Sequence, residues 1–365
     1  MTYIGQSTFS NCEALTSVSL ENGLDSIGNS VFFGCMNLTS IKIPRSVTSI
    51  DGNITDGCMA LKTIMVEKGN TKYDSRNNCN AIIETETTTL IAGCKNTTIP
   101  YSVSSIGERA FVGQNTMTSI VIPNGVTSIC YSAFSGCTKL TTITIPNSVE
   151  TIGGGAFNNT AWYKNQSDGL VYAGKVLYEY KGDMPEDTKI VVPDGVLGIA
   201  GGAFNNCTNL ISITIPSSVV SVGGYKSSHF WGTYEKGYIR TTDISAVDAF
   251  SRCANLKAIF CLNEVPPLSC SFSMNANEGV VRVPKGSVEA YKEADGWKAY
   301  KDILKELIPG DANVDGVVNI ADIVEVVNAV EGKPSERFLP YNADMDGNGI
   351  DVDDVNAIVD SIMQK

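Results

Sequence analysis

Apolar residues recur along this chain with a period of 23 residues. Isoleucine or valine marks the unit at Ile4, Ile27, Ile50, Ile106, Ile129, Ile152, Ile199 and Val222. Within a unit a leucine precedes β-branched residues that alternate with polar ones, as at Leu38, Ile41 and Ile43, and a proline usually follows. The alternation predicts a short half-buried strand that the proline ends. Because one unit cannot bury its own apolar stripe, we expect a repeat solenoid of stacked coils with a parallel β-sheet face.

Two further landmarks repeat in phase. Phenylalanine stands five residues after the start of the unit at Phe9, Phe32, Phe111, Phe134, Phe157 and Phe204, and cysteine eight residues after it at Cys12, Cys35, Cys58, Cys137 and Cys207, with Cys253 in a weaker unit. Equivalent positions on successive coils point inward, so we expect six buried free thiols. The stretch around each phenylalanine predicts a short helical or irregular turn. Two disulfide pairings stay open, Cys79 with Cys94 and Cys261 with Cys270.

Three interruptions break the period. Residues 80–94 and 168–180 alternate and carry turn residues, so we expect inserted β-hairpins that project from the solenoid. Residues 223–247 lack every landmark. They supply our candidates for ligand binding, because exposed loops and aromatic side chains are favoured contacts: Tyr225, His229, Phe230, Trp231, Tyr234 and Tyr238. The alternative is that these rings pack the insertion onto the solenoid.

The repeats decay after residue 262. Val281 and Val283 predict a last strand, and an amphipathic helix with inward rings should follow, from Val288, Tyr291, Trp297, Tyr300 and Leu304. Polar residues of the alternating segments should line the exposed strand face, at Ser40, Ser119, Thr142, Thr144, Ser212 and Thr214. Met1 lies three residues before the first repeat, with neither a cap nor a signal peptide, so we expect a fragment of a longer protein.

Composition excludes several functions for this chain of 365 residues. The formal net charge of −12 disfavours nucleic-acid binding. The sequence contains no run of roughly 18 to 20 apolar residues, the length that a membrane-spanning helix needs. The single histidine excludes a mechanism that needs two imidazoles.

The string IGNSVFFGCMNLTSIKIPRSVTS, which begins at Ile27, resembles the leucine-rich repeat of BspA-like bacterial surface proteins. The resemblance covers residues 4–262 and implies a right-handed leucine-rich-repeat coil. Residues 263–305 resemble the C-terminal cap of the same family, which gives a repeat domain over residues 1–305. A secreted or bacterial cell-surface location follows from the resemblance.

Residues 308–365 are acidic and contain a duplicated loop. The first copy places oxygen donors at Asp311, Asn313, Asp315, Val317 (through its carbonyl), Asn319 and Asp322, with Gly316 at the turn. This is the spacing that calcium, a hard cation, needs. The second copy offers Asp344, Asp346, Asn348, Asp351 and Asp354 but spans only 11 residues. An alternative register from Asn342 to Asp353 restores twelve residues but puts Gly349 where an apolar residue is expected, so the register of the second loop stays open. The alternative to a calcium site is a chance acidic loop.

Two such loops, each leading into a short apolar helix, resemble a type I dockerin, the module that binds cohesin domains. The resemblance implies a small all-α domain over residues 306–365, two calcium sites, and the cohesin domain of a scaffold or surface protein as partner. The positions that set partner choice in that family map to Ile320, Ala321, Val352 and Asp353. These are not the hydroxyl pair of the best-known clostridial modules.

These features favour a non-catalytic exported binding or adhesion protein, whose repeats bind an unknown protein or glycan and whose dockerin attaches it to a cohesin. The alternative is a component of a cellulosome-like or polysaccharide-degrading complex with carbohydrate-binding or hydrolase activity, since dockerins commonly accompany hydrolases. The sequence displays no glycosidase carboxylate pair, nucleophile elbow or Cys/His constellation, which favours the non-catalytic hypothesis.

Overall fold

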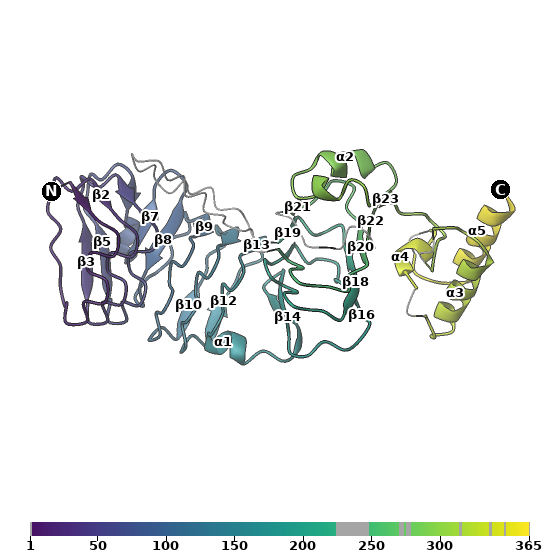
Figure 1. Ribbon diagram of the computed structural model, residues 1–365, viewed down its shortest axis with the longest axis horizontal. Coiled ribbons are helices and arrows are strands. Elements are labelled where there is room, and N and C mark those ends of the chain that lie inside the picture. The colour runs from purple at the N-terminus through teal and green to yellow at the C-terminus, as the bar shows by residue number, and fades with distance from the viewer. Residues whose placement is uncertain are drawn as a thin grey trace.

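The computed structural model describes residues 2–223, 248–269, 274, 279–313, 316–335, 338–346 and 348–364. Figure 1 shows a long stack of coils, with the N-terminal coil at one end and the helices of the C-terminal segment at the other. Equivalent residues of successive repeats are therefore neighbours in space. The predicted parallel solenoid is confirmed.

The alternating segments form strands that pair in parallel with the next coil. They are β3 (Ser40–Ile43) with β5 (Thr63–Val66), β10 (Ser119–Val121) with β12 (Thr142–Thr144), and a five-stranded sheet of β16 (Thr188–Val191), β18 (Leu210–Ile215), β20 (Ala258–Cys261), β22 (Val280–Val283) and β23 (Leu304–Glu306). The register is one repeat, since Ile41 lies opposite Ile64 and Ile120 opposite Ile143. In β3 the two isoleucines are buried and Ser40 and Lys42 are exposed, as the alternation predicts.

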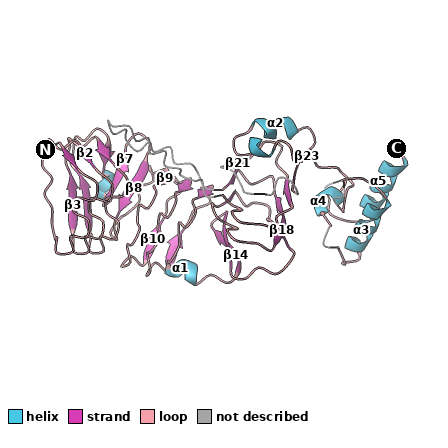
Figure 2. Ribbon diagram, viewed as in Figure 1, coloured by secondary structure: helices cyan, strands magenta, loops and turns pink. Residues whose placement is uncertain are grey.

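A second ladder of strands, which the sequence pattern did not predict, runs along the same stack (Figure 2). Its members are β1 (Tyr3–Ile4), β2 (Ser26–Ile27), β4 (Ser49–Ile50), β9 (Ser105–Ile106), β11 (Ser128–Ile129), β13 (Thr151–Ile152), β17 (Gly198–Ile199), β19 (Ser221–Val222) and β21 (Leu268–Ser269). Each strand has two residues, too few for alternation to be visible in the sequence. Only pairing with the neighbouring coil creates it.

The phenylalanine stretch of each coil forms hydrogen-bonded turns. The Phe134 ring lies between those of Phe111 and Phe157, with centroid distances of 5.0 and 5.7 Å. Its backbone N–H donates to the carbonyl of Ala156 on the next coil at 2.8 Å. The same repeat step therefore aligns both the rings and the main chain.

The in-phase thiols extend this ladder. The Cys137 thiol donates to the carbonyl of Phe111 at 3.0 Å, and Cys58 donates to Phe32 in the same way at 3.1 Å. Five of the six predicted thiols are buried and unpaired, but the prediction is wrong for Cys12, which is exposed because no earlier coil covers it among the described residues. Cys79, Cys94 and Cys261 are also free thiols, and Cys270 lies outside the described residues.

The two predicted hairpins form, but they do not project. Each hairpin joins the second ladder. The first consists of β7 (Ala81–Glu84) and β8 (Thr89–Gly93), which pairs with β9; it is preceded by β6 (Tyr73–Asp74) and the short helix η1 (Arg76–Asn78). The second consists of β14 (Gly169–Ala173) and β15 (Val176–Lys181), which pairs with β17. The helix α1 (Ala161–Lys164) precedes the second hairpin. Ile82, Ile83 and Leu90 are fully buried, so apolar burial draws the hairpins into the stack.

A tyrosine from each inserted segment, Tyr73 of β6 and Tyr178 of β15, completes a hydrogen-bond ladder where the repeat is interrupted. The Tyr73 hydroxyl accepts the N–H of Ile50 at 3.0 Å, and the Tyr178 hydroxyl accepts the N–H of Phe157 at 3.0 Å. In uninterrupted coils the next coil supplies a carbonyl for such donors. The hydroxyl groups therefore satisfy buried main-chain donors that the insertion leaves without that carbonyl.

The end of the solenoid is capped by α2 (Val288–Glu293) and the short helix η2 (Lys298–Tyr300). Tyr291 and Trp297 are buried as predicted, and the Trp297 indole donates to the Pro267 carbonyl at 2.8 Å. The prediction of a single helix that extends to Leu304 is wrong. Gly296 has a positive φ of 81°, which separates the two helices, and Leu304 begins β23.

The C-terminal segment contains α3 (Ile320–Val330), α4 (Pro340–Ala343) and α5 (Val352–Met363) around a small apolar core. Leu307 and Leu339 pack with Phe260 on the outer face of β20, so the segment contacts the end of the solenoid. Among the residues described, no helix is long and apolar enough to cross a membrane.

Native alkylation should separate the thiols by their position in the stack. Burial raises the pKa of Cys58, Cys137 and Cys253 to about 12, so little reactive thiolate forms near pH 8. We expect iodoacetamide to modify Cys12 in the folded protein and to modify Cys35, Cys58, Cys137, Cys207 and Cys253 only after denaturation, as measured by peptide mass spectrometry. Rapid native labelling of the latter group would contradict the stacked ladder.

Two adjacent phenylalanines provide a matched test of the ring stack. Phe32 is fully buried against Phe9, with centroids 5.8 Å apart, whereas its neighbour Phe33 is 39% exposed. We expect Phe32→Ala to lower the free energy of unfolding by about 3 to 5 kcal/mol and Phe33→Ala by about 1 kcal/mol or less. Urea denaturation measures both, and equal losses would show that stacking does not govern stability.

Candidate functional site

The first acidic loop of the C-terminal segment is closed by two fully buried carboxylates. Asp311 accepts the N–H of Gly316 at 3.0 Å, and Gly316 has a φ of 94°, which a residue with a side chain adopts at a cost. Asp322 accepts the N–H groups of Asn313 and Asn319 at 3.0 and 2.9 Å. The carboxylates at the first and twelfth loop positions are therefore held by the backbone of the loop itself.

The middle of this loop joins the start of α3. The Asn319 side chain accepts the N–H of Ala321 at 2.7 Å and, with Asp322, forms a capping box. Its amide also donates to the Val317 carbonyl at 3.1 Å. The predicted ligand Asp315 lies outside the described residues.

The second loop repeats these contacts. Asp344 accepts the N–H of Gly349 at 3.1 Å, and Asp354 accepts those of Met345 and Asp351 at 2.6 and 2.9 Å. Asp351 caps α5 in the manner of Asn319. The loop is thus built on the same first and last carboxylates as the first copy, although it is one residue shorter.

Three carboxylates of the second loop converge. Oxygens of Asp344, Asp346 and Asp354 all lie within 4.8 Å of one another. The side-chain amide nitrogen of Asn348 donates to Asp346 at 2.9 Å, so Asn348 contacts this cluster. Several oxygens at such spacing repel one another and fit a hard divalent cation such as calcium, which takes six to eight oxygen ligands.

The structure brings together residues of the register in which the second loop starts at Asp344. In the alternative register, Asn342 would begin the loop, but its side chain is buried and donates to the Asp311 carbonyl at 3.0 Å. Asp353, the last member of that register, is exposed. Asn342 thus joins α4 to the first loop, a role that sequence spacing could not indicate because its partner lies 31 residues away.

The four predicted partner positions lie at the starts of α3 and α5 and are all exposed: Ile320, Ala321, Val352 and Asp353. Ile320 is 75% exposed and Val352 is 59% exposed. The apolar surface extends further than the prediction, along the helices, to the exposed side chains Val324, Val327, Val359 and Met363. Their helical spacing on the side opposite the buried core was the available signal.

The candidate positions on the solenoid differ in outcome. Ser40, Ser119, Thr142 and Thr144 are exposed on the strand face, as expected, and Ser212 is half-buried. Thr214 is buried, which corrects the prediction: its register neighbour Phe260 belongs to the contact with the C-terminal segment. The aromatic candidates of the third interruption, Tyr225 to Tyr238, lie outside the described residues.

Comparisons with known proteins agree with the repeat geometry. Residues 1–89, 91–167 and 180–276 match six copies of the BspA type leucine-rich repeat region. A search among curated proteins gives no match.

Solved structures of similar proteins include three bacterial chains. The pneumococcal vaccine antigen PcpA is 19% identical over 84% of this chain and 64% of its own (TM-score 0.42), and a leucine rich cell surface protein from Faecalibacterium prausnitzii is 25% identical over 71% and 57% (TM-score 0.39). A leucine-rich repeat protein from Bacteroides ovatus is 19% identical over 79% and 68% (TM-score 0.32). This chain spans less than two thirds of the first two structures. The landmarks, their one-repeat register and the match over most of its length show that the chain belongs to the BspA-type leucine-rich repeat family.

Proposed function

We propose that this protein is a non-catalytic binding protein of the bacterial surface or exterior. The repeat domain, residues 1–305, presents a surface for a protein or glycan ligand. Residues 306–365 form a type I dockerin that binds calcium in its two loops and attaches the chain to a cohesin domain.

The observation that carries the attachment proposal is the pairing of two features on the same short segment. Each copy combines two backbone-anchored carboxylates, Asp311 with Asp322 and Asp344 with Asp354, with a helix whose first turn contains the second of them. The exposed apolar side chains of α3 and α5 start beside these loops. Calcium would neutralise the carboxylates and stiffen the helix starts, which would preorganise the apolar surface for a partner.

The binding role of the repeats is supported by architecture. Solenoids built from such repeats expose long surfaces that contact partners, and six copies of the repeat match this chain. The exposed strand residues Ser40, Ser119 and Thr142 and the aromatic candidates between Tyr225 and Tyr238 remain proposals for ligand contact.

Calcium should bind and stabilise the full chain, because the ion relieves repulsion among the converging carboxylates. We expect Asp346→Asn to weaken calcium binding about tenfold, since one charged ligand is lost. Asp360→Asn removes a carboxylate on α5 that is also exposed and does not belong to the three-carboxylate cluster, and it should leave the calcium affinity unchanged. Isothermal titration calorimetry measures both variants, and calcium affinities equal to that of the parent chain in both would contradict the site.

Cohesin capture should depend on both calcium and the apolar surface. We expect the full chain to bind a member of a panel of purified cohesin domains with millimolar calcium and to release it with a chelator. The double variant Ile320→Asp/Val324→Asp should weaken that binding at least about a hundredfold, because it places charge in an apolar contact. The matched control, Val121→Asp/Val191→Asp, adds the same charge at solenoid valines that are 64% and 61% exposed. Calcium binding without capture of any cohesin would refute the attachment proposal.

A further inference from the structure

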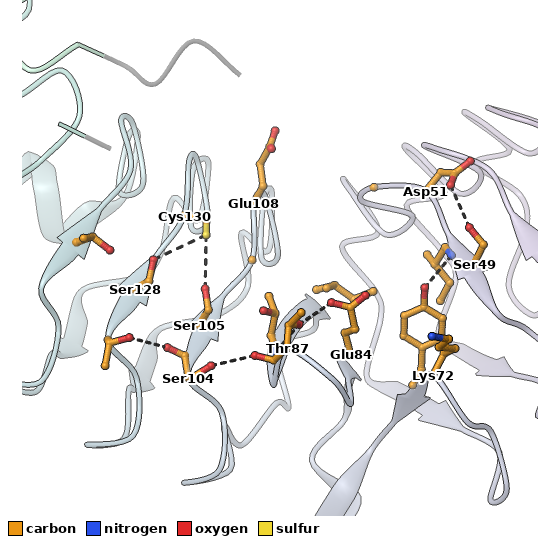
Figure 3. A pocket seen from close by; sticks show the side chains of 18 of the residues that line it. Ser49, Asp51, Lys72, Glu84, Thr87, Ser104, Ser105, Glu108, Ser128 and Cys130 are labelled. Atoms are coloured by element: carbon orange, nitrogen blue, oxygen red, sulfur yellow. Dashed lines mark hydrogen bonds between the residues drawn. The ribbon is translucent and has the colours of Figure 1, made fainter. Parts of the chain in front are cut away.

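A groove of about 580 Å³ lies on the second strand ladder. Most of its lining belongs to the part of the solenoid that precedes the second hairpin, and Leu268 of β21 also lines it. It crosses the six-stranded sheet that runs from β13 through β11, β9, β8 and β7 to β6, and it reaches the end of β4. Figure 3 shows its labelled side chains following one another across these strands. No sequence pattern marked this surface, since it needs coils from both sides of the first interruption.

Short hydroxyl side chains make the floor of the groove. Ser105, Ser128 and Thr151 are register partners on adjacent strands, because the repeat places a hydroxyl residue before the buried isoleucine of each coil. The hairpin contributes Thr87 and Thr89. Small side chains on the floor leave the surface concave and rich in hydrogen-bonding groups.

Carboxylates stand along the whole length of the groove. Among the described lining residues the acidic groups are Asp51, Glu84, Glu108 and Glu150, whereas Lys72 is the one cation. Lys72 also lies 3.8 Å from Glu86, which does not line the groove. Burial raises the pKa of Asp51, which accepts a hydrogen bond from Ser49 at 3.3 Å, so a cationic partner would relieve the cost of its partly desolvated charge.

We propose that this groove binds an extended, basic peptide segment of a protein partner. Lysine or arginine side chains would meet the row of carboxylates, and the peptide main chain would meet the hydroxyl floor. A glycan is less suited, because Tyr73 is the only aromatic ring among the described lining residues and it is buried. Six strands at ordinary spacing span about 24 Å, the length of roughly seven extended residues.

This inference rests on the proposed binding role of the repeats and names the partner chemistry, but it does not involve the C-terminal attachment. The test measures binding of fluorescent heptalysine to the full chain by anisotropy, with heptaglutamate as the reference peptide. We expect Glu108→Gln/Glu150→Gln to weaken heptalysine binding about tenfold. The control Glu13→Gln/Glu186→Gln changes the net charge equally at exposed glutamates outside the groove and should have little effect. Circular dichroism checks that both variants fold.

The inference is supported if the parent chain binds heptalysine, if salt weakens this binding, and if only the groove variant lowers the affinity. Equal loss in both double variants would show general attraction to an acidic protein and would overturn it. So would absence of binding, or displacement of heptalysine by a neutral heptasaccharide, which would assign the groove to a glycan. None of these negative results touches calcium-dependent cohesin capture, so failure of the inference and failure of the attachment proposal are distinguishable.

Discussion

The stacking of equivalent residues at the strand spacing is the constraint from which the rest of this structure follows. A single coil exposes an apolar stripe and unpaired main-chain groups on both edges, and it can satisfy neither by itself. The neighbouring coil supplies both partners. The Phe134 ring contacts Phe111 and Phe157 while its N–H meets the carbonyl of Ala156, so side-chain packing and main-chain pairing share one repeat step.

Stacking requires that each coil supply a strand and a turn, but these need not come from consecutive repeats in the sequence. On the turn edge the third coil meets the fourth directly, where Arg109 forms an ion pair with Asp56 across the first interruption. On the sheet edge the hairpin strands β7 and β8 fill the corresponding space, and Tyr73 supplies an acceptor. The first insertion therefore enters on the sheet side without exposing the core.

Two different kinds of interaction organise the two ends of the molecule. Apolar burial holds the coils, whereas backbone hydrogen bonds to carboxylates such as Asp322 and Asp354 hold the loops of the C-terminal segment. Contact of Leu339 with Phe260 joins the segment to the last coils. Helices α3 and α5 lie beyond one end of the solenoid, whereas most of the acidic groove crosses the coils from the N-terminal part of the stack to β13 near its middle (Figure 1). In the proposed function, the repeats would therefore separate the attachment from the ligand.

The sequence by itself determined the repeat period, the inward landmarks such as Phe32 and Ile41, the inserted hairpins and the order of carboxylates in the two loops. Each of these depends on residues close together in the chain. The two-residue strands, the exposure of Cys12, the burial of Thr214 and the groove across Ser105 were decided only by the tertiary structure. Their partners lie one coil or more away, and local periodicity does not specify which surfaces neighbouring coils or the C-terminal segment will cover.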